Sequence, residues 1–344
     1  MPRTTIADVA RTANVSKATV SRVLAGQTKY VREETRQRVQ NAIDELGYHP
    51  SSAARSLKSK RSFTLGIVGY GLDLFGPSRT LSGIEQEASE LGYTILLHVI
   101  RRPETNNVEQ LLGNMQSHYV DGIIWAVPEI GNNHSWLENN DLRLSVPVVF
   151  LTMKPRSNQF IVTIDNRSGG LAATRHLIVQ GYQNIGLITG PLDWWEARQR
   201  KLGWQEALQS AGLSAKDSLV DEGNWTAISG EHCLAQLLTR HPEIDGVFVC
   251  NDSMALGAAK AARERGLRIP QDLAIVGFDD MPDAAYFCPA LSTVRQDMVE
   301  LGCRAVRELR EVIEANRSGT TFTPKNVVLQ PELIVRESSV RTGS

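Results

Sequence analysis

Apolar residues recur at helical spacing in three short stretches near the N-terminus. Ile6, Val9 and Ala10 fall at i, i+3 and i+4, and residues 12–15 then break the pattern. The next two sets are Val20, Val23 and Leu24, followed by Val39, Ala42, Ile43 and Leu46. Such spacing predicts short amphipathic helices, the first two joined by a tight turn. We therefore expect a three-helix domain of a helix-turn-helix type, about fifty residues long.

From residue 63 short apolar runs alternate with amphipathic stretches. The runs predict strands at 65–68, 94–99, 122–127, 146–151, 161–164, 185–189, 246–250, 273–277 and 291–294. The amphipathic stretches predict helices at 79–91, 108–115, 170–179, 200–211, 231–238, 254–265 and 301–315. This alternation is typical of doubly wound parallel sheets. It predicts an α/β body of two similar lobes, with a ligand between them beyond the carboxyl ends of the strands.

A basic segment at 48–61 joins these two parts. Pro50 suits the first turn of a helix, and residues 53–57 could extend it. So short a helix is not stable alone in water. The apolar Leu57 is unusual in such a basic linker. We expect a hinge that becomes helical when something holds it, with a plain flexible linker as the alternative.

Charge is distributed unevenly along the chain. Residues 1–61 hold 12 Lys and Arg against 5 Asp and Glu, whereas the remainder holds 25 against 33. The net charge of −1 therefore hides a basic head on an acidic body. This asymmetry favours a polyanionic partner at one end only. The second predicted helix also presents Lys17, Ala18, Ser21 and Arg22 outward, as a helix that enters the DNA major groove does.

Composition excludes several other classes of protein. No apolar run reaches the roughly 18 residues of a membrane span, and the N-terminus lacks the apolar core of a signal peptide, so we expect a cytoplasmic protein with no membrane partner. Cys233, Cys250, Cys288 and Cys303 are widely spaced, and we expect them to pack as small apolar residues. We expect no cofactor and no metal.

An enzyme on a dinucleotide-binding fold is a competing hypothesis. Gly69 and Gly71 suggest a phosphate-binding loop, but the next glycine, Gly76, comes five residues later rather than the three that the motif requires. No pairing of a nucleophile with a base lies at useful spacing. The sequence therefore predicts that the chain is not an enzyme.

The order of these parts resembles the LacI/GalR family of bacterial repressors. The stretches that carry the resemblance are T-I-A-D-V-A, N-V-S-K-A-T-V-S-R-V-L, E-E-T-R-Q-R-V, G-Y-H-P-S-S-A-A-R-S-L, N-D-S-M-A-L-G-A, G-L-R-I-P-Q-D and V-G-F-D-D. They run from residue 5 to beyond 279, almost the whole chain. The body also resembles periplasmic sugar-binding proteins, which lack a DNA-binding head.

The resemblance implies roles for residues of the head and hinge. Lys17, Ala18 and Arg22 match positions that contact base edges in the major groove. Phosphate contacts are implied for Thr5, Asn14, Ser16, Thr19 and Ser21. Leu57 matches a side chain that is wedged into the minor groove at the operator centre, with Ala54 and Lys58 beside it. Ala25 departs from the family pattern, where Asn is frequent, so one phosphate contact is expected to be missing.

The resemblance also implies an effector site in the body. Arg198, Asn251 and Asp279 follow predicted strands of one lobe and match ligand-contacting positions. Their guanidinium, amide and carboxylate groups can hydrogen-bond to sugar hydroxyls. The other matched residues are Trp194 and Trp225 as aromatic platforms, Gln296 at a crossover between the lobes, and Leu74 and Phe75 in the loop after the first strand. Each has a plain alternative, because an Asp after a strand is commonly a cap and a Trp commonly belongs to the core.

This combination of aromatic and hydrogen-bonding residues favours a neutral sugar as effector. The loop W-W-E-A-R-Q-R and Trp225 resemble relatives that respond to galactosides or β-glucosides. The alternatives are an activator and a non-sugar effector such as a purine. A sugar-binding protein with an inert head is a third class of function.

The sequence thus predicts a homodimeric repressor that binds a near-palindromic double-stranded operator, with no leucine heptad beyond residue 337 to make a tetramer. Sugar binding would control its affinity for that operator. We expect the head at 1–47, the hinge at 48–61 and the body at 62–344. Within the body, lobe 1 is expected at about 62–162 and 292–322, and lobe 2 at about 163–291 and 323–340.

Overall fold

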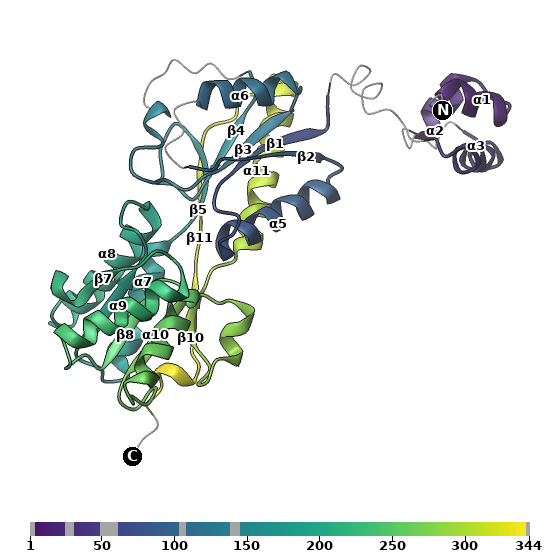
Figure 1. The fold of residues 1–344 in the computed structure, drawn as a ribbon. Coiled ribbons are helices and arrows are strands. Elements are labelled where there is room, and N and C mark those ends of the chain that lie inside the picture. Colours follow the sequence, from purple (N-terminus) through teal and green to yellow (C-terminus); the bar gives the residue numbers. More distant parts are fainter. Residues whose placement is uncertain (1–3, 25–30, 49–60, 103–107, 138–144, 342–344) are drawn as a thin grey trace. The chain divides into compact units, whose positions relative to one another are not determined.

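The computed structural model describes residues 4–24, 31–48, 61–102, 108–137 and 145–341 (Figure 1). The chain divides into two compact units, a head that ends at Phe63 and a body that begins at Thr64. The hinge predicted at 48–61 lies outside the described residues except at its two ends. The head and the body are each described separately below.

The head consists of three helices around one small core. They are α1 (Ile6–Thr12), α2 (Lys17–Leu24) and α3 (Glu33–Leu46), as the apolar spacing predicts. The backbone N–H of Thr5 donates to the Asp8 carboxylate at 2.9 Å, and the Thr5 hydroxyl donates to the same oxygen at 2.7 Å. These bonds close the N-terminus of α1. The buried apolar residues shared by the helices are Val9, Ala10, Ala13, Val20, Val39, Ala42 and Tyr48.

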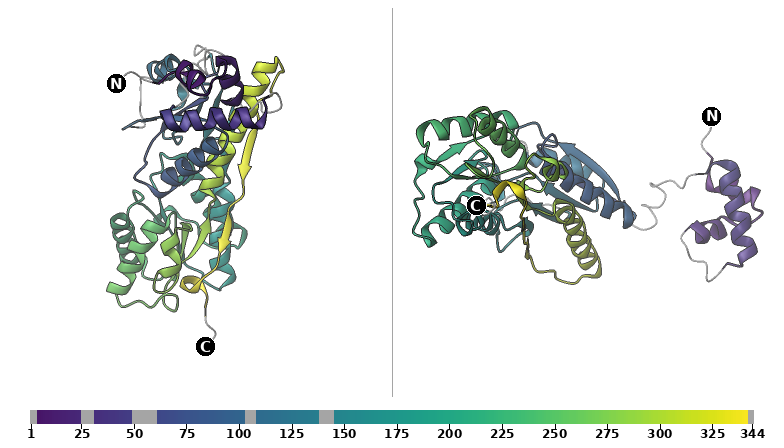
Figure 2. Two further views of the ribbon diagram at one scale, coloured as in Figure 1. Left: turned by 90° about the vertical axis from the view of Figure 1, so that its right-hand side faces the viewer. Right: turned by 90° about the horizontal axis from the view of Figure 1, so that it is seen from below.

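The first lobe of the body is a parallel sheet in the strand order β11-β5-β4-β3-β1-β2. The strands are β1 (Thr64–Gly69), β2 (Thr94–Val99), β3 (Gly122–Ala126), β4 (Val148–Leu151), β5 (Phe160–Ile164) and β11 (Asn326–Leu329). Helix α6 (Val108–Ser117) packs its apolar side on a cluster that includes Ile123 and Phe150. Helices α5 (Phe75–Glu90) and α11 (Met298–Ser318) pack against each other and against strands of the sheet. Figure 2 gives two further views.

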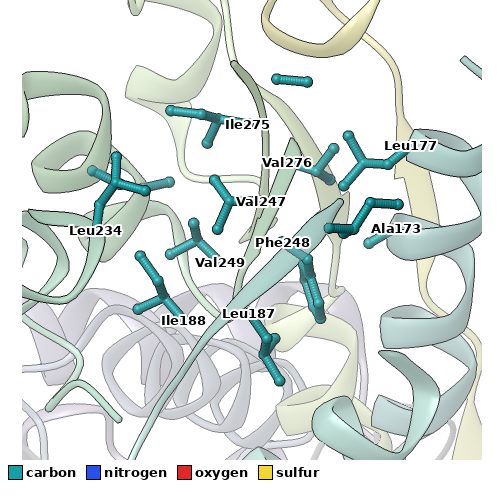
Figure 3. Packing of buried hydrophobic residues seen from close by; sticks show 14 of the residues in the cluster. Ala173, Leu177, Leu187, Ile188, Leu234, Val247, Phe248, Val249, Ile275 and Val276 are labelled. Carbon is teal, nitrogen blue, oxygen red and sulfur yellow. The ribbon is translucent and has the colours of Figure 1, made fainter. Parts of the chain in front are cut away.

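The second lobe repeats this plan, with the strand order β12-β10-β9-β8-β6-β7. Its strands are β6 (Ile185–Thr189), β7 (Val220–Glu222), β8 (Gly246–Val249), β9 (Ala274–Asp279), β10 (Ser292–Arg295) and β12 (Glu332–Ile334), and only β12 pairs antiparallel. Its main helices are α7 (Asn166–Val179), α8 (Trp195–Ser210), α9 (Ala227–Arg240) and α10 (Asp252–Glu264). Leu187, Val247 and Phe248 project from the central strands into the buried core, where Leu177 and Leu234 reach them from the helices (Figure 3).

The chain passes between the lobes later than the sequence predicts. Residues 292–295 were expected in lobe 1, but β10 pairs with β9, with Ser292 opposite Val276, and so belongs to the second sheet. Residues 326–329 were expected in lobe 2, but β11 pairs with β5 in the first sheet. The chain therefore crosses after β5, after β10 and again between β11 and β12. The physical reason is that β10 lies inside the second sheet, between β9 and β12, whereas β11 is an edge strand whose partner β5 is distant in sequence.

Most helices of the body begin earlier than their apolar periodicity indicates, and two of them matter for the cavity. Helix α5 begins at Phe75 rather than at residue 79, and α8 begins at Trp195 rather than at residue 200. Both first turns face the cavity described below. Cavity-lining positions are not selected for a uniform apolar stripe, so periodicity alone does not reveal these turns.

Other expectations concern cysteines and membranes. Cys233, Cys250 and Cys303 are buried as predicted, whereas Cys288 is exposed, and all four are free thiols. Across the described ranges, no helix combines the length and the apolar character that a membrane span requires.

Candidate functional sites

Helix α2 of the head carries the predicted DNA-reading residues. Lys17, Ala18 and Arg22 are all exposed, and their spacing places them on one face of the helix. Val20 on the opposite side is buried in the core of the head. A basic face on a helix that is fixed from behind by its own core is suited to the major groove.

The residues expected to contact phosphate surround the start of this helix. The backbone N–H of Thr19 donates to the Ser16 hydroxyl at 3.1 Å, so Ser16 caps α2 as predicted. The hydroxyls of Ser16 and Thr19 also lie 2.9 Å apart. Thr5 and Asn14 are exposed, whereas Ser21 is half-buried. The predicted groove-wedge residues Ala54, Leu57 and Lys58 lie outside the described residues, as does Ala25.

The body holds a cavity of about 390 Å³ between its two lobes. It lies beyond the carboxyl ends of β1, β6, β8 and β9, where doubly wound sheets bind ligands. The predicted residues that line it are Leu74, Phe75, Trp194, Trp225, Asn251 and Asp279. Arg198 and Gln296 are not among the lining residues.

The prediction for Arg198 is wrong. Its guanidinium donates to the carbonyl oxygens of Leu192 at 2.9 Å and Asp193 at 2.8 Å, and so it braces the loop before α8. The arginine that lines the cavity is Arg200, which is 4% exposed. Because α8 already begins at Trp195, residues 198 and 200 point in different directions from the helix.

Arg200 is held by close packing of its helix against α7. A Cβ at Gly170 of α7 would lie 2.4 Å from the Arg200 carbonyl oxygen, and one at Gly203 would lie 2.2 Å from the carbonyl oxygen of Arg167. Both positions therefore require glycine. The Arg200 Nε donates to Asn166 Oδ1 at 2.7 Å, and Nη1 donates to the carbonyl oxygen of Cys250. These contacts fix the guanidinium in place.

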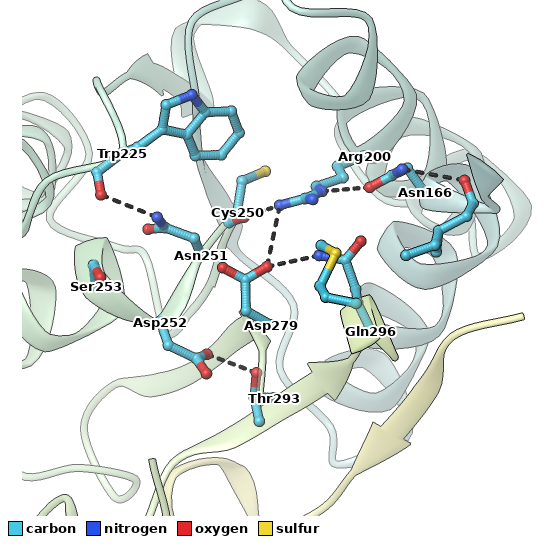
Figure 4. Close-up of polar contacts among 12 residues, drawn as sticks. Asn166, Arg200, Trp225, Cys250, Asn251, Asp252, Ser253, Asp279, Thr293 and Gln296 are labelled. Atoms are coloured by element: carbon cyan, nitrogen blue, oxygen red, sulfur yellow. Dashed lines mark hydrogen bonds and ion pairs between the residues drawn. The ribbon is translucent and has the colours of Figure 1, made fainter. Parts of the chain in front are cut away.

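Arg200 faces Asp279 at the end of β9 (Figure 4). Arg200 Nη1 lies 3.9 Å from Asp279 Oδ1, and Gln296 Nε2 donates to the same oxygen at 2.7 Å. Gln296 is thus a positioning residue for Asp279 instead of a lining residue. Burial raises the pKa of Asp279 to about 6, although the guanidinium of Arg200 opposes that shift. Among the described residues, Arg200 Nη2 and Asp279 Oδ2 have no hydrogen-bond partner.

Asn251 and Asp252 mark the start of α10. Asn251 Oδ1 accepts from the backbone N–H of Met254 at 2.8 Å, and its amide donates to the carbonyl oxygen of Trp225 at 3.0 Å. Its side chain therefore caps a helix and holds Trp225 in addition to lining the cavity. Asp252 accepts from the Thr293 hydroxyl at 2.6 Å.

A third buried acid, Glu196, lies in the first turn of α8 and lines the cavity. Burial raises its pKa to about 7, and burial together with the charge of Asp279 raises the pKa of Asp252 to about 8. We refer to Glu196, Asp252 and Asp279 as the cavity carboxyls.

Two tryptophans close one side of the cavity. The rings of Trp194 and Trp225 have centroids 5.6 Å apart and planes at 67°, which is an edge-to-face contact. Trp225 lies against Gly190, where a Cβ would come within 2.2 Å of the indole ring. The absence of a side chain at Gly190 therefore leaves room for the Trp225 indole.

Polar and apolar lining residues are segregated between the lobes. The ionisable groups of Arg200 and the cavity carboxyls all come from the second lobe. The first lobe contributes a largely apolar wall, which includes Ile67, Leu72, Leu74, Phe75, Pro77, Leu97 and Leu151. A ligand here meets hydrogen-bonding groups on one side and apolar surface on the other.

A backbone clasp joins the two lobes beside the cavity. The N–H of Gly131 donates to the Asp193 carbonyl at 2.7 Å, and the N–H of Trp195 donates to the Glu129 carbonyl at 2.8 Å. These bonds form an isolated antiparallel bridge that pairs Ile130 with Trp194. We call residues 129–131 and 193–195 the interlobe clasp. It ties a cavity-lining loop of the second lobe to the first.

The first-lobe side of the clasp is braced by a small polar network. Asn133 Oδ1 accepts from the N–H of Ile130 at 3.0 Å, and its amide donates to the carbonyl of Pro128 at 2.9 Å. The neighbouring His134 is buried and accepts from Trp125 Nε1 at 3.1 Å. Burial lowers the pKa of His134 to about 4, so the ring is neutral at physiological pH.

Sequence reasoning missed Glu196, Arg200 and Asp252. The signal for the first two was present, because Glu196, Arg200, Gly203 and Ala207 share one helix face that is otherwise small or apolar. Ionisable residues on a buried face indicate a polar site rather than a plain core. This face can be recognised in the sequence only if α8 is known to begin at Trp195.

Models of two protein families match the chain. "Bacterial regulatory proteins, lacI family" matches residues 5–51, and "Periplasmic binding protein-like domain" matches residues 174–339. Among known relatives, the HTH-type transcriptional repressor PurR of Haemophilus influenzae is 33% identical over 334 residues, which are 97% of this chain and 98% of that protein. The PurR protein of Salmonella paratyphi A is 34% identical over 339 residues, 97% of this chain and 96% of that protein.

Solved structures give the same picture. The lac repressor dimer bound to operator and the anti-inducer ONPF has a TM-score of 0.85 at 30% identity, covering 99% of this chain and 100% of that one. A complex of the transcriptional regulator CelR with cellobiose has a TM-score of 0.71 at 32% identity, covering 98% of this chain and 100% of that one.

Proposed function

The chain belongs to the LacI family of DNA-binding transcriptional repressors, and on that premise we propose that a neutral sugar in the cavity of the body controls its affinity for an operator. Its relatives are repressors and not enzymes, which supports an effector site rather than a catalytic site in the cavity. The proposed effector is of the galactoside or β-glucoside type. The proposed operator is near-palindromic double-stranded DNA, bound by a homodimer in the cytoplasm.

The observation that carries this proposal is the Arg200–Asp279 pair. Both side chains are buried, and Arg200 Nη2 and Asp279 Oδ2 keep unused hydrogen-bonding capacity among the described residues. Adjacent hydroxyls of a sugar ring can accept from the guanidinium and donate to the carboxylate at once. Because the two charges oppose each other, an ionised ligand gains little there. The pair therefore suits a ligand that is polar but uncharged.

The aromatic residues support the same ligand class. Ring faces of sugars carry C–H groups that pack on aromatic surfaces, and Trp194, Trp225 and Phe75 all line the cavity. The apolar wall of the first lobe suits a glycoside that carries a second ring or an apolar substituent. The CelR relative, in complex with cellobiose, supports a sugar effector by analogy.

A purine base is the second candidate class, because the two relatives quoted above are both named PurR. A flat base is held best between parallel aromatic faces. The indoles of Trp194 and Trp225 instead meet at 67°, which disfavours such a sandwich. The sugar is therefore the leading proposal.

In the head, Lys17, Ala18 and Arg22 are proposed to contact base edges from α2. Thr5, Ser16, Thr19 and Ser21 are proposed to position the head on phosphates. Ala54, Leu57 and Lys58 are proposed to enter the minor groove at the operator centre. Sugar binding would then stabilise a state of the body in which these hinge residues release the groove. Sugar and operator affinities are reciprocally linked in such a scheme.

Two measurements on the full chain test this proposal. Tryptophan fluorescence, sensitive to Trp194 and Trp225, is titrated with galactosides, β-glucosides, their disaccharides and purine bases. A mobility shift then uses a duplex selected from a random library, with competitor DNA and two salt concentrations. A neutral sugar should bind and release the duplex. Binding of purines alone, or sugar binding without any change in operator affinity, would contradict the proposal.

A further inference from the structure

Glu196 is a buried acid that has no hydrogen-bond or ion-pair partner among the described residues. Its side chain lines the cavity, and the residue is only 8% exposed. Among the described residues, nothing donates a hydrogen bond to its carboxylate, and no cation lies within ion-pair distance. The other two cavity carboxyls differ, because Asp279 accepts from Gln296 and Asp252 accepts from Thr293 and from the N–H of Met281. A buried polar group is ordinarily satisfied by hydrogen bonds, so Glu196 lacks a donor that a ligand can supply.

The charges around the cavity also restrict the ligand. Carboxyl groups that line it belong to Asp73, Glu196, Asp252, Asp279 and Asp283, whereas Arg200 is the lone cation among the lining residues the structure describes. The Arg200 guanidinium is already engaged by Asn166, by the carbonyl of Cys250 and by Asp279. A ligand carboxylate or phosphate would therefore face several acids and one cation, whose charge is already opposed by Asp279 and of which, among the described residues, only Nη2 is free to donate.

Building on the proposed sugar effector, we propose that Glu196 is the specificity-determining residue of the cavity. Its carboxylate accepts a hydrogen bond from an effector hydroxyl, and it repels sugars that carry a negative charge. The regulator would thus respond to a neutral sugar and not to the corresponding uronic acid or phosphate ester.

The ionisation of Glu196 provides a second readout. Burial holds its pKa near 7, Arg200 of the same helix lowers it, and Asp279 of β9 raises it. The other acids of the cavity are Asp252 at the start of α10, which is largely protonated at neutral pH, and Asp73 and Asp283 in two lining loops. A hydroxyl that donates to Glu196 stabilises the ionised carboxylate, so binding releases protons near pH 7. Affinity for the neutral sugar should therefore rise between pH 6 and pH 8.

The test compares two probes that differ only at one carbon. Methyl β-glucoside carries a hydroxymethyl group where methyl β-glucuronide carries a carboxylate, and methyl β-galactoside and its uronide form a parallel pair. Wild type, Glu196→Gln and Glu206→Gln are titrated by tryptophan fluorescence at several pH values, with glucose 6-phosphate as the phosphate ester. Glu206 lies on the same helix with an exposed side chain that pairs with Arg167, so it is a matched control.

Wild type should prefer the neutral member of the better-binding pair by about a hundredfold, the size of a like-charge contact in a buried site. In Glu196→Gln, affinity for the neutral sugar should fall about tenfold, since a neutral hydrogen bond replaces a charge-assisted one. The preference for the neutral sugar over the uronide should also fall about tenfold. The rise in affinity between pH 6 and pH 8 should disappear. Glu206→Gln should behave as wild type.

The outcomes separate this inference from the proposed function. If a neutral sugar binds wild type but Glu196→Gln keeps the same affinity, pH profile and preference, the role of Glu196 is overturned while the sugar effector stands. If no neutral sugar of the panel binds wild type, the proposed effector class falls, and the role of Glu196 falls with it.

Discussion

Replacement of Asp279 by Asn tests the polar centre of the cavity most directly. The change removes the carboxylate that faces the buried Arg200 guanidinium at 3.9 Å and keeps the shape of the side chain. Removal of one partner from a buried ion pair costs about 3–5 kcal/mol, because the remaining charge stays uncompensated. This value is the upper limit of the unfolding free energy that Asp279→Asn can lose.

Glu196 is expected to reduce the loss of unfolding free energy in Asp279→Asn. It lies one helical turn before Arg200, and the charge of Asp279 contributes to its raised pKa of about 7. At pH 8 the Glu196 carboxylate, with its pKa of about 7, is already mostly ionised, and its attraction to the Arg200 guanidinium offsets part of the loss of Asp279. We therefore expect Asp279→Asn to lose about 2 kcal/mol of unfolding free energy at pH 8, while the double variant with Glu196→Gln loses the full 3–5 kcal/mol.

Urea unfolding of the full chain at pH 8, followed by tryptophan fluorescence, measures these differences. Every tryptophan of the chain lies between residues 125 and 225, so the signal reports on the body alone. The matching functional assays are sugar titration, where we expect loss of measurable affinity, and the operator mobility shift, where the unliganded variant should bind as wild type does. Additive effects of the two substitutions, or an Asp279→Asn variant that sugar still releases from DNA, would refute this account of the cavity.

Three further predictions address the aromatic wall, the reading helix and pH. Gly190→Ala should displace the Trp225 indole, which a Cβ would approach to 2.2 Å, and lower sugar affinity at least tenfold in a fluorescence titration; Gly113→Ala, with open space around it, is the control. Arg22→Ala should cost about 1–3 kcal/mol of operator binding and relax sequence preference in a mobility shift, whereas Arg36→Ala on α3 should change neither. The body should be more stable at pH 6.5 than at pH 8.5 by about 2–3 kcal/mol, because two cavity carboxyls with pKa values of about 7 and 8 hold protons that the unfolded chain has released; urea unfolding that shows higher stability at pH 8.5 would contradict this sign.

Much of the fold is predictable because its central strands are buried on both faces. β6 coincides with its predicted limits, and β1, β3, β5 and β8 differ by a residue at one or both ends. β2 is also predicted to the residue although it is an exposed edge strand, because its run of β-forming residues is longer. The strands that the sequence does not reveal are β7, β11 and β12, which have only three or four residues and remain partly exposed. Their short, mixed pattern carries no period that distinguishes a strand from a loop. The error in the lobe boundaries follows mainly from those edge strands, because β11 and β12 carry the last crossing.

The residues of the site also fall into two groups, those that were predicted and those that were misplaced or missed. Asn251 and Asp279 were implied by the family resemblance and supported by their place at strand ends, since topology brings such positions to one edge of a sheet. Arg198 was wrong and Arg200 was missed, because helical side chains two residues apart point in different directions. The direction of a helical side chain can therefore be predicted only when the first residue of the helix is known. The place of a residue directly after a strand can be predicted without that knowledge.

The interlobe clasp lies wholly beyond what side-chain patterns can predict, because its bonds join backbone groups of residues about 60 positions apart. The free energy of these hydrogen bonds is nevertheless similar to the coupling free energy that a regulator needs between its two ligand sites. Two backbone hydrogen bonds contribute about 1–3 kcal/mol together, and coupling between two ligand sites is typically about 1–3 kcal/mol. The clasp includes Trp194, which lines the cavity, and it adjoins Glu196. A ligand that orders this loop against the first lobe strengthens the clasp, and one that displaces Trp194 weakens it. The same contact can therefore be biased in either direction by ligands that differ only in how they meet one indole ring.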